Sequence, residues 1–147
     1  MSDYYLYIIP EDPYYVPSEE QVAQTISLLR ETCPEIEIEA TTTQEVRFID
    51  PGSNLHTIYC PECRRLLDIA WWQEVMRAKY ATGFVDMEVE TPCGHRTRLD
   101  RLEYAWPAGF ARFSITLFNP DCEISGQDIH RISKLLGVDV KTIYAHY

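Results

Sequence analysis

The sequence lacks the features that mark several common protein classes. No segment approaches roughly 18 consecutive apolar residues, the length that a membrane-spanning helix needs, so we expect no membrane association. The first residues carry acids and no basic cluster, which predicts no secretory signal and a cytoplasmic location. The motifs of serine hydrolases, P-loop proteins, dinucleotide-binding proteins and HExxH metalloproteases are also missing. We therefore expect a protein that is not an enzyme.

Positive charge is scarce in the first third of the chain. Residues 1–50 hold 11 acidic residues and only two basic ones, Arg30 and Arg47. The whole chain of 147 residues has a net charge of −10, so nearly all of that charge arises in this segment. Such asymmetry disfavours nucleic-acid binding by the first third and suits a surface for a basic partner. A solubilising surface is the simpler alternative.

The two ends of the chain carry the same pattern of predicted elements. Residues 3–43 predict a strand, a helix and a second strand, and residues 109–147 predict the same order. Ser18 and Ser125 are expected to begin the two helices, each with a capping partner three residues later. The pattern therefore indicates two copies of a βαβ unit, with a different segment between them.

Two βαβ units side by side predict an α+β fold of the ferredoxin-like type, with four antiparallel strands and both helices on one face. We predict a single domain over residues 1–147, in which residues 44–107 form a zinc-ribbon-like, zinc-binding insert between the two halves. The strand that begins at residue 35 and the C-terminal strand are expected to be the edges of the sheet.

Two fragments of the insert have the spacing of metal ligands. A C-P-E-C turn supplies Cys60 and Cys63, and a glycine-containing turn thirty residues later supplies Cys93 and His95. Two thiolates from one tight turn and two N or S ligands from another make a tetrahedral structural site. We therefore predict a structural Zn²⁺ bound by these four residues. His56 is the alternative fourth ligand, because the C-x-H spacing is tighter than usual.

Two other interpretations of the cysteines stay open. A C-x-x-C pair at the start of a helix can act as a redox site, although Arg64 and Arg65 lie between the motif and the helix expected near Leu66. The pair can also be plain buried thiols. Cys33 and Cys122 have no ligand spacing, and we interpret them as core or free thiols.

The C-P-E-C turn is similar to half of a zinc ribbon, although Arg64 stands where a glycine usually follows. The stretch "TPCGHRTRLDRLEYAWPAGFARFSITLFNP" resembles a family of uncharacterised bacterial proteins, which read Pro-Cys-Cys-Gly, Leu-Asn-Asp-Leu, Trp-Pro-Ala-Gly-Phe-Ala-Arg-Phe and Asn-Pro there. The likeness covers residues 57–120 and implies a bacterial origin and a zinc-ribbon-like insert, with no known activity. Gly94 occupies the place of the family's second cysteine, which implies that His95 takes over as fourth ligand.

Function is expected on the acidic, tyrosine-rich first third. We predict a non-enzymatic protein-interaction module, of the inhibitor or immunity type, that binds a basic protein partner. The predicted contact residues are Tyr5, Tyr7, Glu35, Glu37 and Glu39. The alternative is a zinc module that binds nucleic acid through arginines near the metal ligands. These arginines are Arg64, Arg65, Arg96, Arg98 and Arg101.

Overall fold

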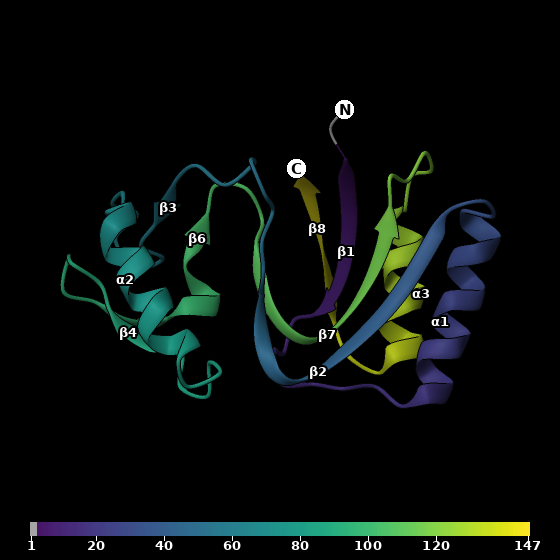
Figure 1. The fold of residues 1–147 in the computed structure, drawn as a ribbon, viewed down its shortest axis with the longest axis horizontal. Helices are drawn as coiled ribbons and strands as arrows, with labels where there is room; N and C mark the ends of the chain where they lie inside the picture. Colours follow the sequence, from purple (N-terminus) through teal and green to yellow (C-terminus); the bar gives the residue numbers. More distant parts are fainter. Residues whose placement is uncertain (1–2) are drawn as a thin grey trace.

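The computed structural model describes residues 3–147, and its ribbon has two parts joined by two long strands (Figure 1). Residues 1 and 2, which the predicted single domain includes, lie outside the described residues. The elements in chain order are β1 (Tyr4–Pro10), α1 (Glu19–Thr32), β2 (Glu37–Ile49), β3 (Ile58–Tyr59), α2 (Ile69–Tyr80), β4 (Glu88–Glu90), β5 (Arg96–Arg98), the 3₁₀ turn η1 (Leu99–Arg101), β6 (Glu103–Tyr104), β7 (Gly109–Phe118), α3 (Gly126–Leu136) and β8 (Val140–His146).

The larger part is a four-stranded sheet in the order β2-β7-β1-β8. Each neighbouring pair of strands is antiparallel, and α1 and α3 lie together on one face of the sheet (Figure 1). The predicted α+β class is therefore confirmed. Within residues 3–147, no helix combines the length and the apolar character that crossing a membrane requires.

The predicted capping pairs begin both helices of this layer. The Ser18 hydroxyl accepts a hydrogen bond from the Gln21 amide, and the Gln21 side chain accepts one from the Ser18 amide. Ser125 and Asp128 make the same reciprocal pair at the start of α3. Each cap satisfies amides that the first helical turn leaves free, which stabilises a helix by about 1 kcal/mol.

Apolar side chains fill the space between this sheet and its helices. Alternation along β1 and β7 points every second residue toward the helices, and the helices present their apolar stripes in return. The buried residues of this core include Leu6, Ile8, Leu29, Phe113, Ile115, Leu117, Ile132 and Leu136. Burying a side chain of this size contributes roughly 2 kcal/mol, so this core holds the helical layer on the sheet.

Cys33 and Cys122 form a disulfide, so their interpretation as core or free thiols is wrong. Cys33 caps the C-terminus of α1, and Cys122 lies in the loop before α3. Their Cα atoms are 5.8 Å apart, a separation that a disulfide spans readily. The bridge ties together two helices that already pack side by side. Because the two cysteines are 89 positions apart in the sequence, no local pattern predicts this disulfide.

The smaller part contains α2 and two short antiparallel sheets, β3–β6 and β4–β5. The predicted glycine-containing turn with Cys93 and His95 connects the antiparallel strands β4 and β5, and the helix expected near Leu66 is α2. This part has its own core, which includes Val46, Ile58, Cys60, Trp72, Phe84, Leu99 and Phe110. Val46 belongs to β2 and Phe110 to β7, so both long strands contribute to this core as well.

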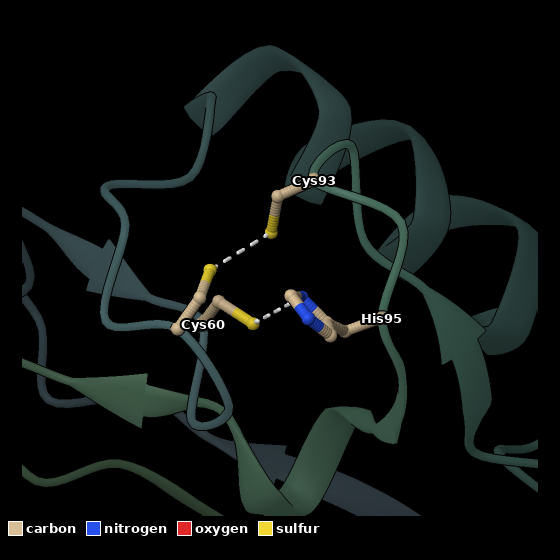
Figure 2. A group of neighbouring side chains, drawn as sticks. Cys60, Cys93 and His95 are labelled. Carbon is tan, nitrogen blue, oxygen red and sulfur yellow. Dashed lines mark hydrogen bonds between the residues drawn. The ribbon is translucent and has the colours of Figure 1, made fainter.

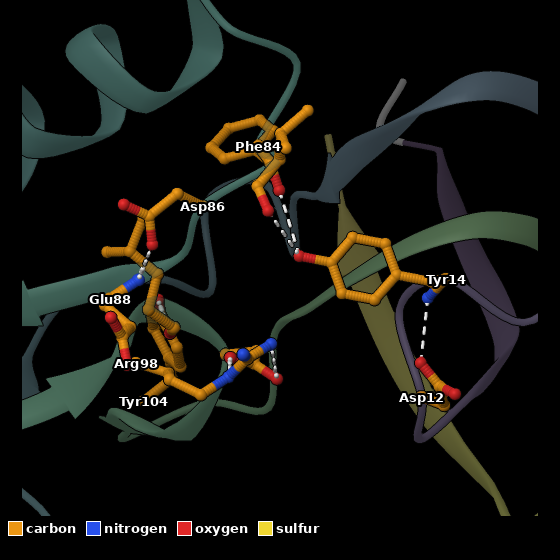
Figure 3. Close-up of polar contacts among 10 residues, drawn as sticks. Asp12, Tyr14, Phe84, Asp86, Glu88, Arg98 and Tyr104 are labelled. Atoms are coloured by element: carbon orange, nitrogen blue, oxygen red, sulfur yellow. Dashed lines mark hydrogen bonds and ion pairs between the residues drawn. The ribbon is translucent and has the colours of Figure 1, made fainter.

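A change of register bends the two long strands toward the smaller part. The pairing of β2 with β7 is regular from Glu37 to Thr42, shifts, and resumes at Arg47. Extra residues of this kind bend a strand and increase its twist. A second connection joins the two parts at the loop after β1. The Tyr14 hydroxyl lies within hydrogen-bond distance of the carbonyls of Phe84 at 3.1 Å and Val85 at 3.2 Å (Figure 3).

Candidate metal centre

The four predicted ligands converge in the smaller part. One ligand atom from each of Cys60, Cys63, Cys93 and His95 lies within 4.8 Å of all the others. The Sγ atoms of Cys63 and Cys93 are 3.4 Å apart, and Cys60 Sγ is 3.8 Å from His95 Nδ1 (Figure 2). Ligand atoms of a tetrahedral zinc site are about 3.5–3.8 Å apart, given Zn–S near 2.3 Å and Zn–N near 2.0 Å. The side chains are therefore spaced to hold a metal ion. His56 is exposed and is not a member of this group.

The first ligand turn is closed by its own backbone. The Arg64 amide donates to the Cys60 carbonyl at 2.9 Å, and the Cys60 amide donates to the Arg65 carbonyl at 2.9 Å. Arg64 has a φ of 64°, which is the left-handed conformation that glycine adopts without strain. An arginine therefore occupies a backbone conformation in this turn that glycine adopts at no steric cost. The redox interpretation needs this cysteine pair at the start of a helix. Residues 64–68 separate Cys63 from α2, which begins at Ile69.

The second ligand turn is organised by Thr91, a residue that the sequence did not single out. Thr91 donates its amide to the His95 carbonyl at 2.8 Å, and its hydroxyl accepts from the His95 amide at 3.0 Å. The same hydroxyl is 3.1 Å from Cys93 Sγ, and Gly94 supplies the left-handed position with a φ of 86°. Thr91 is buried, so these contacts are shielded from water. It fixes both ligands of the turn at once.

The local electrostatics of the thiols favour a cation. Hydrogen bonds from Thr91 and His95 lower the pKa of the Cys93 thiol to about 6. The Arg65 amide lowers the pKa of the Cys63 thiol, but partial burial and the neighbouring thiols Cys93 and Cys60 outweigh it and leave that pKa raised. Thiolates so close together repel one another, and a bound cation removes this repulsion.

The cluster is joined directly to the core of the smaller part. Cys60 is fully buried within that core, whereas Cys63 and Cys93 pack against its margin. A metal ion bound by three thiolates and one imidazole would have four protein ligands and no position left for a reacting water. The donor set therefore fits an ion that fastens two turns to a small core. Catalytic zinc sites differ because they keep an open position.

Four of the five predicted partner contacts lie on one face of the larger sheet. Backbone pairing across the three strands β1, β7 and β2 places them in two rows, Tyr5–Phe118–Glu37 and Tyr7–Thr116–Glu39. Because directly paired residues point to the same side of a sheet, both rows share the face opposite the helices. The Tyr5 ring packs on the Phe118 ring with centroids 5.1 Å apart.

Glu35 does not belong to these rows. The alternating sequence placed it on a strand from residue 35, but β2 begins at Glu37, and Glu35 lies in the turn after Pro34. The proline favours an extended or turn conformation before it and stops the helix, and the chain then needs this turn to enter the sheet. Glu35 is exposed there, so the structure leaves it beside the acidic rows and outside them.

The five predicted arginines of the smaller part divide into two groups. Arg64 pairs with Glu103 at 2.7 Å, and Arg98 pairs with Asp100 at 2.9 Å. Arg65, Arg96 and Arg101 are exposed and make no ion pair with any residue between positions 3 and 147. Two of the five predicted arginines are thus neutralised locally.

Comparison with known proteins finds no relative of this chain. No model of a protein family matches the chain, no curated protein matches it, and no solved structure matches it. What the protein does therefore has to follow from its metal-ligand cluster and from the surface of its larger sheet.

Proposed function

We propose that the fold is ferredoxin-like, with a zinc-ribbon-like insert over residues 44–107 that resembles the bacterial family described above. Support comes from the strand order β2-β7-β1-β8 with two helices on one face, which is the order of two interleaved βαβ units. Further support comes from two ligand turns that face each other across a small core.

The metal in this proposal is Zn²⁺, and its role is structural. Its support is the Cys₃His donor set, which is typical of closed zinc sites. Elemental analysis of untagged protein should give about one zinc per chain, and removal by a chelator should unfold the smaller part. The measurement is the near-ultraviolet circular dichroism of Trp71 and Trp72, because both tryptophans lie on α2. A metal-free protein with an unchanged spectrum and melting curve would contradict the zinc proposal.

The function in this proposal is protein interaction. The face opposite the helices binds a basic protein partner, in the manner of an inhibitor or an immunity-type protein, and the chain acts in the cytoplasm without catalysis. The observation that carries it is the pair of rows that put Tyr5, Tyr7, Glu37 and Glu39 on one face. Half-buried tyrosines beside exposed carboxylates suit a surface that attracts a basic protein and then packs against it.

Charge-matched variants test this function. Glu37→Gln with Glu39→Gln removes two charges from the face, and Glu74→Gln with Glu123→Gln removes two from exposed positions elsewhere. Binding of a basic partner isolated from the native lysate should weaken strongly in the first variant, weaken little in the second and decline with salt. Equal binding by both variants, or retention that is independent of salt, would contradict the proposed surface.

Nucleic-acid binding is the second candidate function. It is favoured by three of the predicted arginines, Arg65, Arg96 and Arg101, which are exposed and make no ion pair within residues 3–147. Filter binding of a nucleic acid at low salt should weaken when Arg96→Ala and Arg101→Ala are combined. The salt dependence should also fall by about two counterions. No retention of either single-stranded or duplex nucleic acid at low salt would exclude this candidate.

A further inference from the structure

Within residues 3–147, the outer edge of β2 has no partner strand. β2 is 13 residues long and is the terminal strand of the order β2-β7-β1-β8, so β7 is its only neighbour in this part of the chain. Its regular stretch, from Glu37 to Thr42, precedes the shift of register. At about 3.3 Å per residue, this stretch offers an open edge close to 20 Å long.

The opposite edge of the sheet is formed by β8, and other parts of the chain cover the end of this strand. The loop after β2 covers the end of β8: the Ser53 amide donates to the His146 carbonyl at 2.8 Å, and the His146 amide donates to the Pro51 carbonyl at 3.1 Å. The Trp106 indole donates to the Tyr144 carbonyl at 2.7 Å. Natural sheets protect exposed edges in this way, because unpaired edges recruit other strands. The protein covers one edge and leaves the other open.

The hydrogen bonds of β7 fix the direction of those of β2. The Asn119 amide, one residue beyond β7, donates to the Tyr4 carbonyl on the β1 side at 2.9 Å. Backbone direction alternates along a strand, so Phe118, Thr116 and Ser114 direct their amides and carbonyls toward β2.

The residues of β2 opposite those three therefore use their backbone groups in the ladder with β7. The outward amides and carbonyls belong to the intervening residues, Ile38, Ala40 and Thr42. No residue in the described chain forms a hydrogen bond with these outward groups, and Ala40 and Thr42 are exposed. The outward amides and carbonyls of Ala40 and Thr42 are therefore open to solvent, and only a further strand or water can satisfy them.

The side chains along this edge select the occupant. Edge strands are commonly protected by lysine or proline, and the stretch from 37 to 42 has neither. It carries Glu37 and Glu39, both exposed. A second copy of the chain would set two acidic strands against each other, and like charges opposite one another destabilise a pair of strands. A strand with lysine or arginine at alternate positions would instead meet both carboxylates.

We propose that the edge of β2 binds an extended basic segment of the partner, which adds to the sheet as a fifth strand. This inference rests on the proposed function, because it identifies what part of the basic partner the acidic face receives. Main-chain hydrogen bonds to Ile38, Ala40 and Thr42 would supply affinity, while the two glutamates would select alternate basic side chains. Binding of this segment would also cover the exposed edge of β2.

Peptide binding with backbone variants tests the proposal. The probe is a short fluorescent peptide in which lysine alternates with threonine and valine. Ala40→Pro removes one outward amide and keeps the ladder to β7, since proline is tolerated on edge strands where the lost amide faces solvent. It should weaken peptide binding by about tenfold or more. The control Ala40→Thr keeps the amide and should bind within about twofold of wild type.

A second measurement on the unmodified protein is independent of whether Ala40→Pro folds. Amide hydrogen exchange at Ala40 and Thr42 should be fast in the free protein and slow at saturating peptide. Unchanged exchange at these amides would overturn the proposal. A salt-sensitive complex that needs Glu37 and Glu39 but ignores Ala40→Pro would also overturn it, while leaving the proposed acidic surface intact.

The remaining outcomes are equally decisive. Absence of any peptide binding at low salt would overturn the strand-addition proposal, and if the isolated partner also fails to bind, the proposed function fails with it. A dimer that forms without peptide and is lost in Ala40→Pro would assign the edge to a second copy of the chain and overturn the basic occupant.

Discussion

Thr91→Val is expected to weaken metal binding although threonine is not a ligand. Valine has nearly the same shape, so the substitution removes the hydroxyl without opening a cavity. That hydroxyl accepts from the His95 amide at 3.0 Å and lies 3.1 Å from Cys93 Sγ. Without it, the second ligand turn loses the group that fixes both of its ligands.

The magnitude follows from these contacts. Leaving the His95 amide without an acceptor lowers the free energy of unfolding by about 1–2 kcal/mol. Residues that orient metal ligands typically change the affinity for the metal by about 10–100-fold when they are removed. Thr97→Val is the matched control, because Thr97 is half-buried on the adjacent strand β5 and forms no side-chain hydrogen bond with the rest of the described chain. Thr91→Ser restores a hydroxyl and should recover most of the affinity.

The assay is competition for zinc against a coloured chelator, followed by thermal unfolding of each loaded variant. Thr91→Val should lose zinc at a lower chelator concentration than either wild type or Thr97→Val. Equal zinc affinity in Thr91→Val and Thr97→Val would refute the role assigned to the hydroxyl. A loss that Thr91→Ser fails to restore would show that the effect comes from packing.

Three further predictions concern stability. Arg64→Gly should be more stable than Arg64→Ala by about 1 kcal/mol in urea unfolding, because both lose the exposed ion pair and only glycine relieves the left-handed backbone; equal stability would contradict this. Tyr104→Phe leaves the Leu99 carbonyl and the Trp72 indole without the half-buried hydroxyl that both contact, and should lower the free energy of unfolding by about 1–3 kcal/mol. Burial raises the pKa of Tyr104, so its contribution is present below pH about 10 and declines above it; unfolding followed against pH should show a steeper decline in wild type than in Tyr104→Phe. Replacing both disulfide cysteines with serine should lower the free energy of unfolding by about 4.6 kcal/mol through chain entropy, checked by urea unfolding; an unchanged midpoint would show that the bridge adds nothing.

Local patterns in the sequence were enough to predict which four side chains cluster in the smaller part and where the helices begin. A capping box and a C-x-x-C turn each depend on residues within a few positions, so Ser18, Ser125, Cys60 and Cys63 could be assigned before the fold was known. The second ligand turn was predicted for the same reason, since a glycine-containing turn between two short strands is a local feature.

Long-range contacts could not be obtained in this way. The partner of Cys33 is 89 residues away, and only the packing of α1 against α3 brings the two thiols together. On α2, Ala70 is exposed, whereas Trp72 is the buried residue. Small and aromatic residues occur on both sides of that helix, and which side is buried depends on Phe48 and Tyr104 from elsewhere in the chain.

The disulfide described above gives the two parts of the protein opposite chemical vulnerabilities. A reducing environment opens the bridge between Cys33 and Cys122 and preserves the thiols of Cys60, Cys63 and Cys93. An oxidising environment preserves the bridge and exposes those same thiols, two of which are 3.4 Å apart, to oxidation that ends metal binding. Without a metal ion in the cluster, no single redox environment preserves both the disulfide and the three thiols. Bound metal therefore decides whether the whole chain tolerates oxidants, and alkylation of the five cysteines in intact cells would reveal which part the native compartment favours.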